Sequence, residues 1–353
     1  MKILSKQQFA FLIVVLVAFF TSFFSPAYGK RDHYVIRIAT LAPKAVGWAK
    51  HIREIIIPGI KRETNHEVKL KFYWNGTLGE EEEYVRLMKA GKLDGASFSA
   101  HGTILACPEM TVLELPFLFQ NYDEVDYIRK KMIKIFDKIT ERNGYKLVLW
   151  TDQDFDQIYS TKYPLTRIED FKKATFVSCF GSLEKAVLES FGVNPIIRTI
   201  KQGSTDIRKN KMNAFIGPAL WVVGSQIYPQ VKYINPMKIR YSPSTALISL
   251  DAWNRIPEEY RKKIQKFRDR EMIEFCKKNR QDSLRAYQAM VKYGAKETNL
   301  NPEDFKLVKD RCRSLWYRLA GKLYEEKILE ELLNHLEEYR ARIERIKSWK
   351  LSN

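Results

Sequence analysis

The chain has 353 residues, of which 45% are hydrophobic and 13% aromatic, enough apolar surface for one large or two ordinary folded domains. Its 16 Gly, 13 Pro and 4 Cys exclude collagen-like, low-complexity and disulfide-dense chains. With 60 Lys and Arg against 42 Asp and Glu, the formal net charge is +18.

The basic residues are spread from Arg31 to Lys350 and are mixed with acids. Nucleic-acid-binding motifs instead gather their basic residues beside Gly or aromatic residues. The excess therefore indicates a solvated surface and no nucleic-acid partner, with attraction to membrane headgroups as the weaker alternative.

Residues 1–29 have the composition of a cleavable secretory signal peptide. Lys2 and Lys6 precede an uncharged run from Phe9 to Phe24, and small residues follow at Ala27 and Gly29. The apolar run is shorter than the ~20 residues of a membrane helix, so an uncleaved anchor is the less favoured alternative. We expect an exported mature chain that begins near Lys30.

Strands and helices alternate through the first half of the mature chain. Alternating and β-branched stretches predict strands at Tyr34–Thr40 and Val68–Trp74. Apolar periodicity predicts helices from Trp48 towards Ile60 and over Glu80–Ala90, the latter ended by Gly91. This alternation is typical of a layered α/β domain.

The second half repeats the pattern and then becomes helical. Strands are predicted at 145–150, 174–178 and 245–250, and helices at 183–191, 207–211, 221–227, 258–292 and, with possible breaks, 302–347. We therefore expect an α/β lobe I at 30–150, a mainly lobe II region with crossover strands at 151–250, and long helices packing across both lobes at 251–353.

A seam of apolar residues runs along the last predicted helix, at Leu329, Leu332, Leu336, Tyr339, Ile343 and Ile346. Their spacing of three and four residues indicates a face that packs against another helix. Because the seam is shorter than three to four heptads, packing on the chain's own lobes is favoured over an intermolecular coiled coil.

No catalytic or metal motif is present. The five His form no HExxH pattern, and GxSxG and P-loop motifs are absent. Ser99 and His101 lie two residues apart on an expected strand, which does not bring them together as a triad requires. The Asp152, Asp154 and Asp156 series lacks the Gly and terminal Glu of a calcium loop. We expect neither an enzyme nor a cofactor, and a hydrolase is the least favoured alternative.

The four cysteines, Cys107, Cys179, Cys276 and Cys312, show no CxxC spacing. An exported chain can form up to two disulfides, but spacing does not pair them, and isolated buried thiols are at least as favoured.

Aromatic residues gather near the ends of predicted strands, where open α/β sheets bind ligands. For each residue alone, core packing is the more common role. The expected lining of a ligand cleft comprises Trp48, Phe98, His101, Trp150, Phe176, Val177, Phe180, Asn213, Phe215 and Trp221.

An ordered set of segments resembles a known family. These are 38–43 (IATLAP), 76–79 (GTLG), 91–95 (GKLDG), 113–119 (LELPFLF), 191–195 (FGVNP) and 251–257 (DAWNRIP). Their order is similar to that of the DctP-like substrate-binding proteins of tripartite ATP-independent periplasmic (TRAP) transporters, over about Tyr34 to Met290. The resemblance implies two α/β lobes joined by crossing strands and a long helix, which close on a small-molecule ligand, a periplasmic location and a membrane permease as partner.

This sequence departs from the family where the ligand's carboxylate is expected to bind. Val177 occupies the position of the family's arginine. Gly217 occupies the position of the asparagine that assists this arginine, and Asn213 that of the family's aspartate. We therefore expect an apolar or amphipathic ligand, as in the subclass that has a tetratricopeptide-repeat partner protein. A substitute arginine, Arg198 or Arg208, is the main competing account, and an exported scaffold that keeps the receptor fold is the alternative function.

Overall fold

The structure is a computed structural model that describes residues 34–352, with the side chains of 350–352 excepted. The predicted signal peptide at 1–29 lies outside the described residues. Among the described residues, no helix has both the length and the apolar character needed to cross a membrane.

The strands of the described residues form one sheet of nine, in the order β2-β1-β3-β8-β4-β7-β5-β6, with β9 paired to β8. Two of them are much longer than the rest and pair antiparallel along most of their length: β4 (Tyr145–Ser160) and β8 (Tyr233–Ser249). The others are β1 (Tyr34–Ala39), β2 (Val68–Tyr73), β3 (Gly95–Phe98), β5 (Phe176–Ser178), β6 (Ile196–Ile197), β7 (Ala214–Gly217) and β9 (Lys296–Glu297).

The two long strands carry one lobe at each end. β3 pairs with β8 at Thr245–Ile248 and brings β1 and β2 with it, which makes lobe I. β7 pairs with the far end of β4 at Gln157–Ser160 and brings β5 and β6, which makes lobe II. The predicted two-lobed α/β fold with crossing strands is confirmed.

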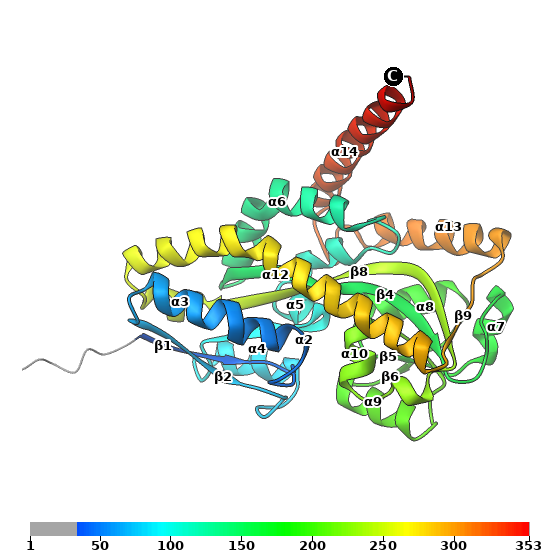
Figure 1. The fold of residues 1–353 in the computed structure, drawn as a ribbon, viewed down its shortest axis with the longest axis horizontal. Coiled ribbons are helices and arrows are strands. Elements are labelled where there is room, and N and C mark those ends of the chain that lie inside the picture. The colour runs from blue at the N-terminus through cyan, green and yellow to red at the C-terminus, as the bar shows by residue number, and fades with distance from the viewer. Residues whose placement is uncertain (1–33, 353) are drawn as a thin grey trace, which may run out of the picture. The chain divides into compact units, whose positions relative to one another are not determined.

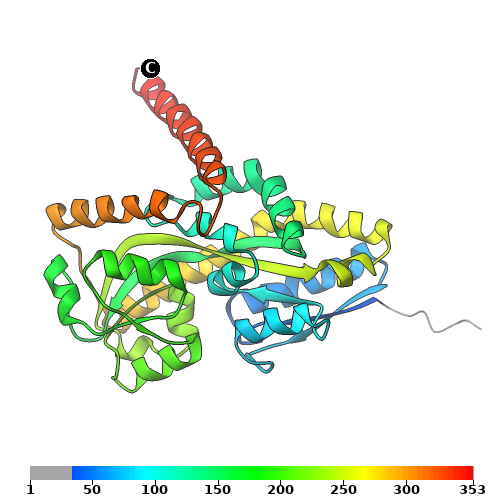
Figure 2. The same cartoon turned by 180° about the vertical axis from the view of Figure 1, so that it is seen from behind.

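The helices cover both faces of the sheet (Figures 1 and 2). The longest, α12 (Glu258–Tyr293), lies along β4 and packs against α2 and α3 of lobe I and α10 of lobe II. Lobe I contains α2 (Gly47–His51), the π-helical turn η1 (Ile52–Ile56), α3 (Ile57–Glu63), α4 (Glu81–Lys89), α5 (Ala100–Ala106) and the 3-10 helix η2 (Pro108–Glu114). The remaining helices are α6 (Tyr122–Arg142), α7 (Ile168–Lys173), α8 (Ser182–Ser190), α9 (Ile200–Arg208), α10 (Ala219–Gly224), η3 (Tyr228–Gln230), α11 (Leu250–Asn254), α13 (Pro302–Leu319) and α14 (Glu326–Ser352).

The C-terminal helix α14 is covered along only part of its apolar seam. Leu329, Leu332 and Leu336 are fully buried, and α14 packs against α6. Beyond the Arg340–Glu124 ion pair the helix projects away from the rest of the described chain (Figures 1 and 2), and Ile346 and Trp349 are 45% and 66% exposed. The protein's own fold therefore covers the first half of the seam.

Several predicted elements differ from the observed ones. The predicted strands at 145–150 and 245–250 are ends of the much longer β4 and β8. The predicted helix at 207–211 begins earlier, at Ile200, where Thr199 and Gln202 form a capping box. The 21-residue helix α6 was not predicted. All four cysteines are buried and unpaired, so the structure has isolated thiols and no disulfide among the described residues.

Packing between α3 and α12 depends on Gly59. A Cβ at this position would lie 2.1 Å from Cζ of Phe267. We expect Gly59→Ala to destabilise the protein by about 1–3 kcal/mol, because the Phe267 ring must leave its place in the core. Gly224→Ala in α10 is the control, since nothing lies within 4 Å of its Cβ position. Equal urea denaturation midpoints for the two variants would contradict this packing.

Candidate ligand-binding site

The two lobes meet at glycine positions. A Cβ on Gly181 of lobe II would lie 3.1 Å from Cδ1 of Ile104 and 3.4 Å from Nδ1 of His101, both in α5 of lobe I. A Cβ on Gly47 of lobe I would lie 4.0 Å from Cδ2 of Leu220 in α10. The lobes are thus in contact around the starts of α5 and α10, and we call this region the lobe junction.

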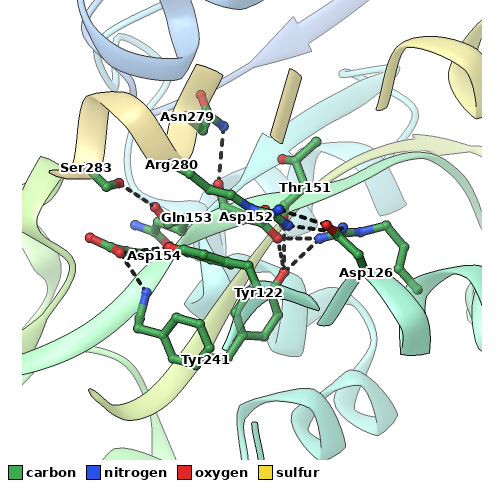
Figure 3. Close-up of polar contacts among 12 residues, drawn as sticks. Tyr122, Asp126, Thr151, Asp152, Gln153, Asp154, Tyr241, Asn279, Arg280 and Ser283 are labelled. Carbon is green, nitrogen blue, oxygen red and sulfur yellow. Dashed lines mark hydrogen bonds and ion pairs between the residues drawn. The ribbon is translucent and has the colours of Figure 1, made fainter. Parts of the chain in front are cut away.

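Strand β4 runs through the lobe junction. Two consecutive residues of this strand each bind the start of a helix, one in each lobe. Gln153 Oε1 accepts a hydrogen bond from the Ala100 amide at the start of α5, at 3.2 Å. Asp154 Oδ2 accepts one from the Ala219 amide at the start of α10, also at 3.2 Å. Figure 3 shows Gln153 and Asp154 together with Tyr122, whose hydroxyl donates to Asp154 Oδ1 at 3.0 Å.

Helix α12 fixes the same stretch of β4 from the other side (Figure 3). Asn279 donates to the carbonyl of Asp152 at 3.2 Å, and Ser283 donates to the carbonyl of Gln153 at 3.3 Å. The side chain of Asp152 is paired with Arg129 and Arg280 and accepts from the Tyr241 hydroxyl. Although burial opposes ionisation, the two guanidiniums hold the pKa of Asp152 below its ordinary value. Asp152 is therefore a structural ion-pair partner.

A second buried ionic cluster lies around Arg240 of β8. Its guanidinium contacts three carboxylates: Nε lies 2.7 Å from Asp156 Oδ2, Nη2 lies 3.1 Å from Glu184 Oε2, and Nη1 lies 3.3 Å from Glu114 Oε2. All four side chains are at most 2% exposed. Burial raises the pKa of Glu114 to about 8, and it also raises the pKa of Asp156 and Glu184 although Arg240 opposes it. One cation thus contacts three acids, although Nη1 of Arg240 forms no hydrogen bond with any described residue.

The helix starts at the lobe junction are also occupied by the protein's own carboxylates. Buried Glu81 accepts from the amide and the hydroxyl of Ser99 at 2.6 Å each and from the amide of Gly102 at 2.9 Å. Asp154 takes the Ala219 amide at the start of α10. Burial raises the pKa of Glu81 and raises that of Asp154 to about 7. These backbone amides therefore already have acceptors.

Four aromatic side chains of lobe II pack beside the Arg240 cluster. Tyr159 stacks on Phe215 with ring centres 5.2 Å apart, and Trp221 packs edge-on against Phe215 at 5.6 Å and against Phe180 at 5.3 Å. Arg240 lies over the Phe180 ring at 5.5 Å. Trp221 is half-buried, whereas the Tyr159 hydroxyl and the Trp221 indole nitrogen are buried and have no hydrogen-bond partner within residues 34–352.

The structure brings some of the predicted lining residues together. Phe180, Phe215 and Trp221 form the aromatic cluster. His101 lies at the lobe junction, where its Nε2 contacts Glu82 Oε1 at 2.9 Å. Trp48 is half-buried and directly follows Gly47, which faces Leu220. These five residues keep a place in the candidate site.

The other predicted lining residues lie elsewhere. Trp150 does not end a strand but lies within β4, fully buried between Phe136 and Arg129. Phe176 stacks on Phe171, and Phe98 packs against Tyr84. Asn213 Oδ1 accepts from the Thr175 amide at 2.8 Å, and Val177 packs towards Gly203 of α9. We assign these five to the packing of their own lobes.

The sequence analysis missed the charged residues of the lobe junction: Glu81, Glu114, Asp156, Glu184 and Arg240. The available signal was weak. Asp156 lies between the apolar residues Phe155 and Ile158, and buried charges require partners. The partner of Asp156, Arg240, lies 84 residues away in sequence, so the pair becomes visible only in the fold.

This arrangement is a two-lobed α/β fold in which β4 and β8 run through both lobes. The chain belongs to the bacterial extracellular solute-binding protein family 7, the DctP family, whose model matches residues 58–323. Its family binds solutes, which confirms the expectation of a binding protein rather than an enzyme.

Similar proteins come from several bacteria. An uncharacterised protein of Haemophilus influenzae is 26% identical over 252 residues, which cover 70% of this chain and 73% of the relative. The 2,3-diketo-L-gulonate-binding periplasmic protein of Escherichia coli is 20% identical over 209 residues, covering 58% and 63% of the two chains.

Solved structures share the fold. A TRAP periplasmic solute-binding protein of Haemophilus influenzae with bound L-gulonate has a TM-score of 0.78 at 20% identity, covering 86% of this chain and 99% of that one. One from Desulfovibrio salexigens with bound orotic acid has a TM-score of 0.77 at 20% identity, covering 88% and 99%.

Removing the guanidinium of Arg240 should be strongly destabilising. We expect Arg240→Met to lower the free energy of unfolding by about 3–5 kcal/mol, because its acidic partners remain buried without a cation. Exposed Arg208, which donates to the carbonyl of Ser225, gives the control Arg208→Met with a change of about 0.5 kcal/mol or less. Chemical denaturation of both variants provides the measurement. Similar losses would show that the Arg240 cluster does not stabilise the fold.

Glu114 should make the stability of the protein depend on pH. The folded state raises the pKa of Glu114 to about 8, so between roughly pH 5 and pH 8 it binds a proton that the unfolded chain has released. Stability should therefore fall as pH rises through this window, by at most about 1.4 kcal/mol per pH unit from this group. The groups facing Glu114 are Arg240, Asp156, Glu184 and Glu81.

Thermal unfolding of two variants across this pH range tests the role of Glu114. In Glu114→Gln the slope should flatten, whereas Glu109→Gln, in the same 3-10 helix and bonded to Asn143, should keep the wild-type slope. A Glu114→Gln variant with an unchanged slope would assign the pH dependence to other groups.

Proposed function

We propose that this chain is a periplasmic receptor that captures an apolar or amphipathic solute at the lobe junction and delivers it to the integral membrane subunits of a TRAP-type secondary transporter. The observation that carries the nature of the solute is the burial of Arg240 among three carboxylates, those of Asp156, Glu184 and Glu114. A carboxylate ligand would have to compete with these buried protein carboxylates for the guanidinium.

The other groups that could hold an acid support the same conclusion. The amides at the starts of α5 and α10 bind Glu81 and Asp154. Of the two substitute arginines considered from the sequence, Arg198 pairs with Asp206 at 2.9 Å, and Arg208 donates to the Ser225 carbonyl at 2.6 Å. The structures with L-gulonate and orotic acid are of proteins that hold acids. This chain would differ from them in ligand chemistry.

The cellular setting in this proposal rests on the predicted signal peptide at 1–29 and on the periplasmic relatives. A tetratricopeptide-repeat protein is a further proposed partner, because the subclass that resembles this chain at Val177 has one. Purification of the tagged mature chain from the periplasm, with and without the permease, would test both partners.

Close contacts at the lobe junction favour a second candidate function, that of an exported scaffold that keeps the receptor fold. Gly181 touches α5 closely, and the aromatic cluster packs on itself. A scaffold holds this closed arrangement without a ligand, whereas a receptor opens when its ligand is removed. Small-angle scattering of the refolded, ligand-free protein distinguishes the two.

The proposed ligand class can be tested with small molecules released from the purified protein on denaturation. We expect mass spectrometry to find an apolar or amphipathic compound, and rebinding of this compound to show a negative heat-capacity change. Trp221→Ala should weaken its binding at least tenfold, whereas Tyr317→Ala, 61% exposed on α13, should leave it unchanged. Micromolar binding of C4-dicarboxylates or sialic acids by the delipidated protein would contradict the proposal.

A further inference from the structure

Helix α14 carries charge of opposite sign in its two halves. Residues 326–338 contain five glutamates and one lysine. Residues 339–353 contain one acid, Glu344, and five basic residues: Arg340, Arg342, Arg345, Lys347 and Lys350. Arg340 is bound to Glu124 of α6, whereas the side chains of Arg345 and Lys347 form no ion pair with any described residue. The end of α14 at 341–349, which we call the helix tip, is therefore a local concentration of positive charge.

An apolar stripe runs along the helix tip beside these basic residues. Residues at intervals of three lie on one face of a helix, and here they are Ile343, Ile346 and Trp349. Ile346 is 45% exposed and Trp349 is 66% exposed. Both line a shallow groove together with Arg342 and Arg345. The tip thus presents apolar and basic side chains on the same side.

The fold holds this stripe away from the two lobes. The first half of α14 packs against α6 and buries its apolar seam there, at Leu329, Leu332 and Leu336. Past the ion pair of Arg340 with Glu124, the helix projects from the rest of the described chain (Figures 1 and 2). A flat surface that approaches from this end meets the helix tip before it meets the lobes.

A second copy of the chain does not complement the helix tip. Because α6 already covers the seam in the first half of α14, another copy can offer only its own tip. Pairing two tips brings Arg345 and Lys347 of one copy close to the same residues of the other, and like charges beside a helix seam oppose association. An anionic lipid surface complements both features of the tip, since headgroup phosphates attract the basic side chains and the acyl layer accepts the apolar ones.

We propose that the helix tip is a docking element for a membrane surface that contains anionic lipids. Arg342, Arg345 and Lys347 contact headgroup phosphates, while Ile346 and Trp349 enter the boundary between headgroups and acyl chains. The contact is reversible, because only a few turns of helix take part in it. This inference goes beyond the proposed function and does not depend on which solute the lobe junction binds.

Co-sedimentation of the full mature chain with lipid vesicles tests this docking. Vesicles of phosphatidylcholine mixed with phosphatidylglycerol should bind the protein at least about tenfold more tightly than vesicles of phosphatidylcholine alone, since each basic residue near an anionic surface contributes about fivefold in affinity. Raising the salt concentration to about 0.5 M should release the protein, because salt screens exposed charges.

A pair of charge variants locates the contact. Replacing Arg345→Gln together with Lys347→Gln should weaken binding to the anionic vesicles about tenfold or more. The matched control, Lys209→Gln with Lys211→Gln, also removes two exposed cations, at the end of α9, which lies on the opposite side of the lobes from the helix tip (Figures 1 and 2). The control should bind like the wild-type chain.

A pair of aromatic variants tests the apolar part of the contact. Trp349→Ala should weaken binding to the anionic vesicles about tenfold, because an interfacial tryptophan no longer enters the headgroup layer. Tyr293→Ala, which removes a side chain that is 64% exposed at the end of α12, should leave binding unchanged. Thermal unfolding checks that all four variants fold.

Equal losses in the helix-tip and α9 charge variants would overturn the inference and assign binding to the net charge of the whole chain. Absence of binding to both kinds of vesicle would also overturn it. A dimer in analytical ultracentrifugation that Trp349→Ala dissociates would overturn it in favour of a second copy. Solute capture fails on a different result: no released compound and no change in scattering on removal of ligand.

Discussion

The antiparallel pairing of β4 with β8 is the interaction on which the rest of the structure depends. These strands of 16 and 17 residues are the one part of the sheet that both lobes share, since β3 adds to β8 and β7 adds to β4. Helix α12 packs along β4 and binds the backbone of Asp152 and Gln153. Each lobe is therefore positioned by its hydrogen bonds to a common pair of strands.

A crossing strand that is buried on both faces imposes strict demands on its charged residues. Asp152 and Asp156 cannot reach water, so each needs cations or donors from elements far away in sequence. Asp152 has Arg129, Arg280 and Tyr241, whereas Asp156 shares Arg240 with two glutamates. The first cluster is balanced and structural. The second brings three acids to one guanidinium, and burial raises the pKa of all three.

Solved structures that share this fold contain acidic ligands. Those with bound L-gulonate or orotic acid hold negatively charged ligands. Here, the guanidinium and the helix starts at the lobe junction are already bound to carboxylates of the protein itself. The shared fold thus provides two lobes and a junction without determining which side chains line that junction.

Local patterns predicted elements well wherever a periodicity and a stop signal coincide. The strand at Val68 and the helix ended by Gly91 are examples, with observed bounds of Val68–Tyr73 and Glu81–Lys89. The full extent of β4 was missed, because charged Asp152, Asp154 and Asp156 interrupt its apolar pattern. For the same reason Trp150 seemed to end a strand, although it lies in the core.

The sequence by itself determined the α/β alternation, the helical C-terminal third, the resemblance to solute-binding proteins and the lack of a catalytic motif, because these depend on local spacing. The tertiary structure alone decided which charges meet. The pairing of β4 with β8 shifts register after Leu147, Asp152 and Asp156, and each shift changes which face a side chain occupies. Only that register places Asp156 opposite Arg240 and brings Glu114 and Glu184 to the same guanidinium.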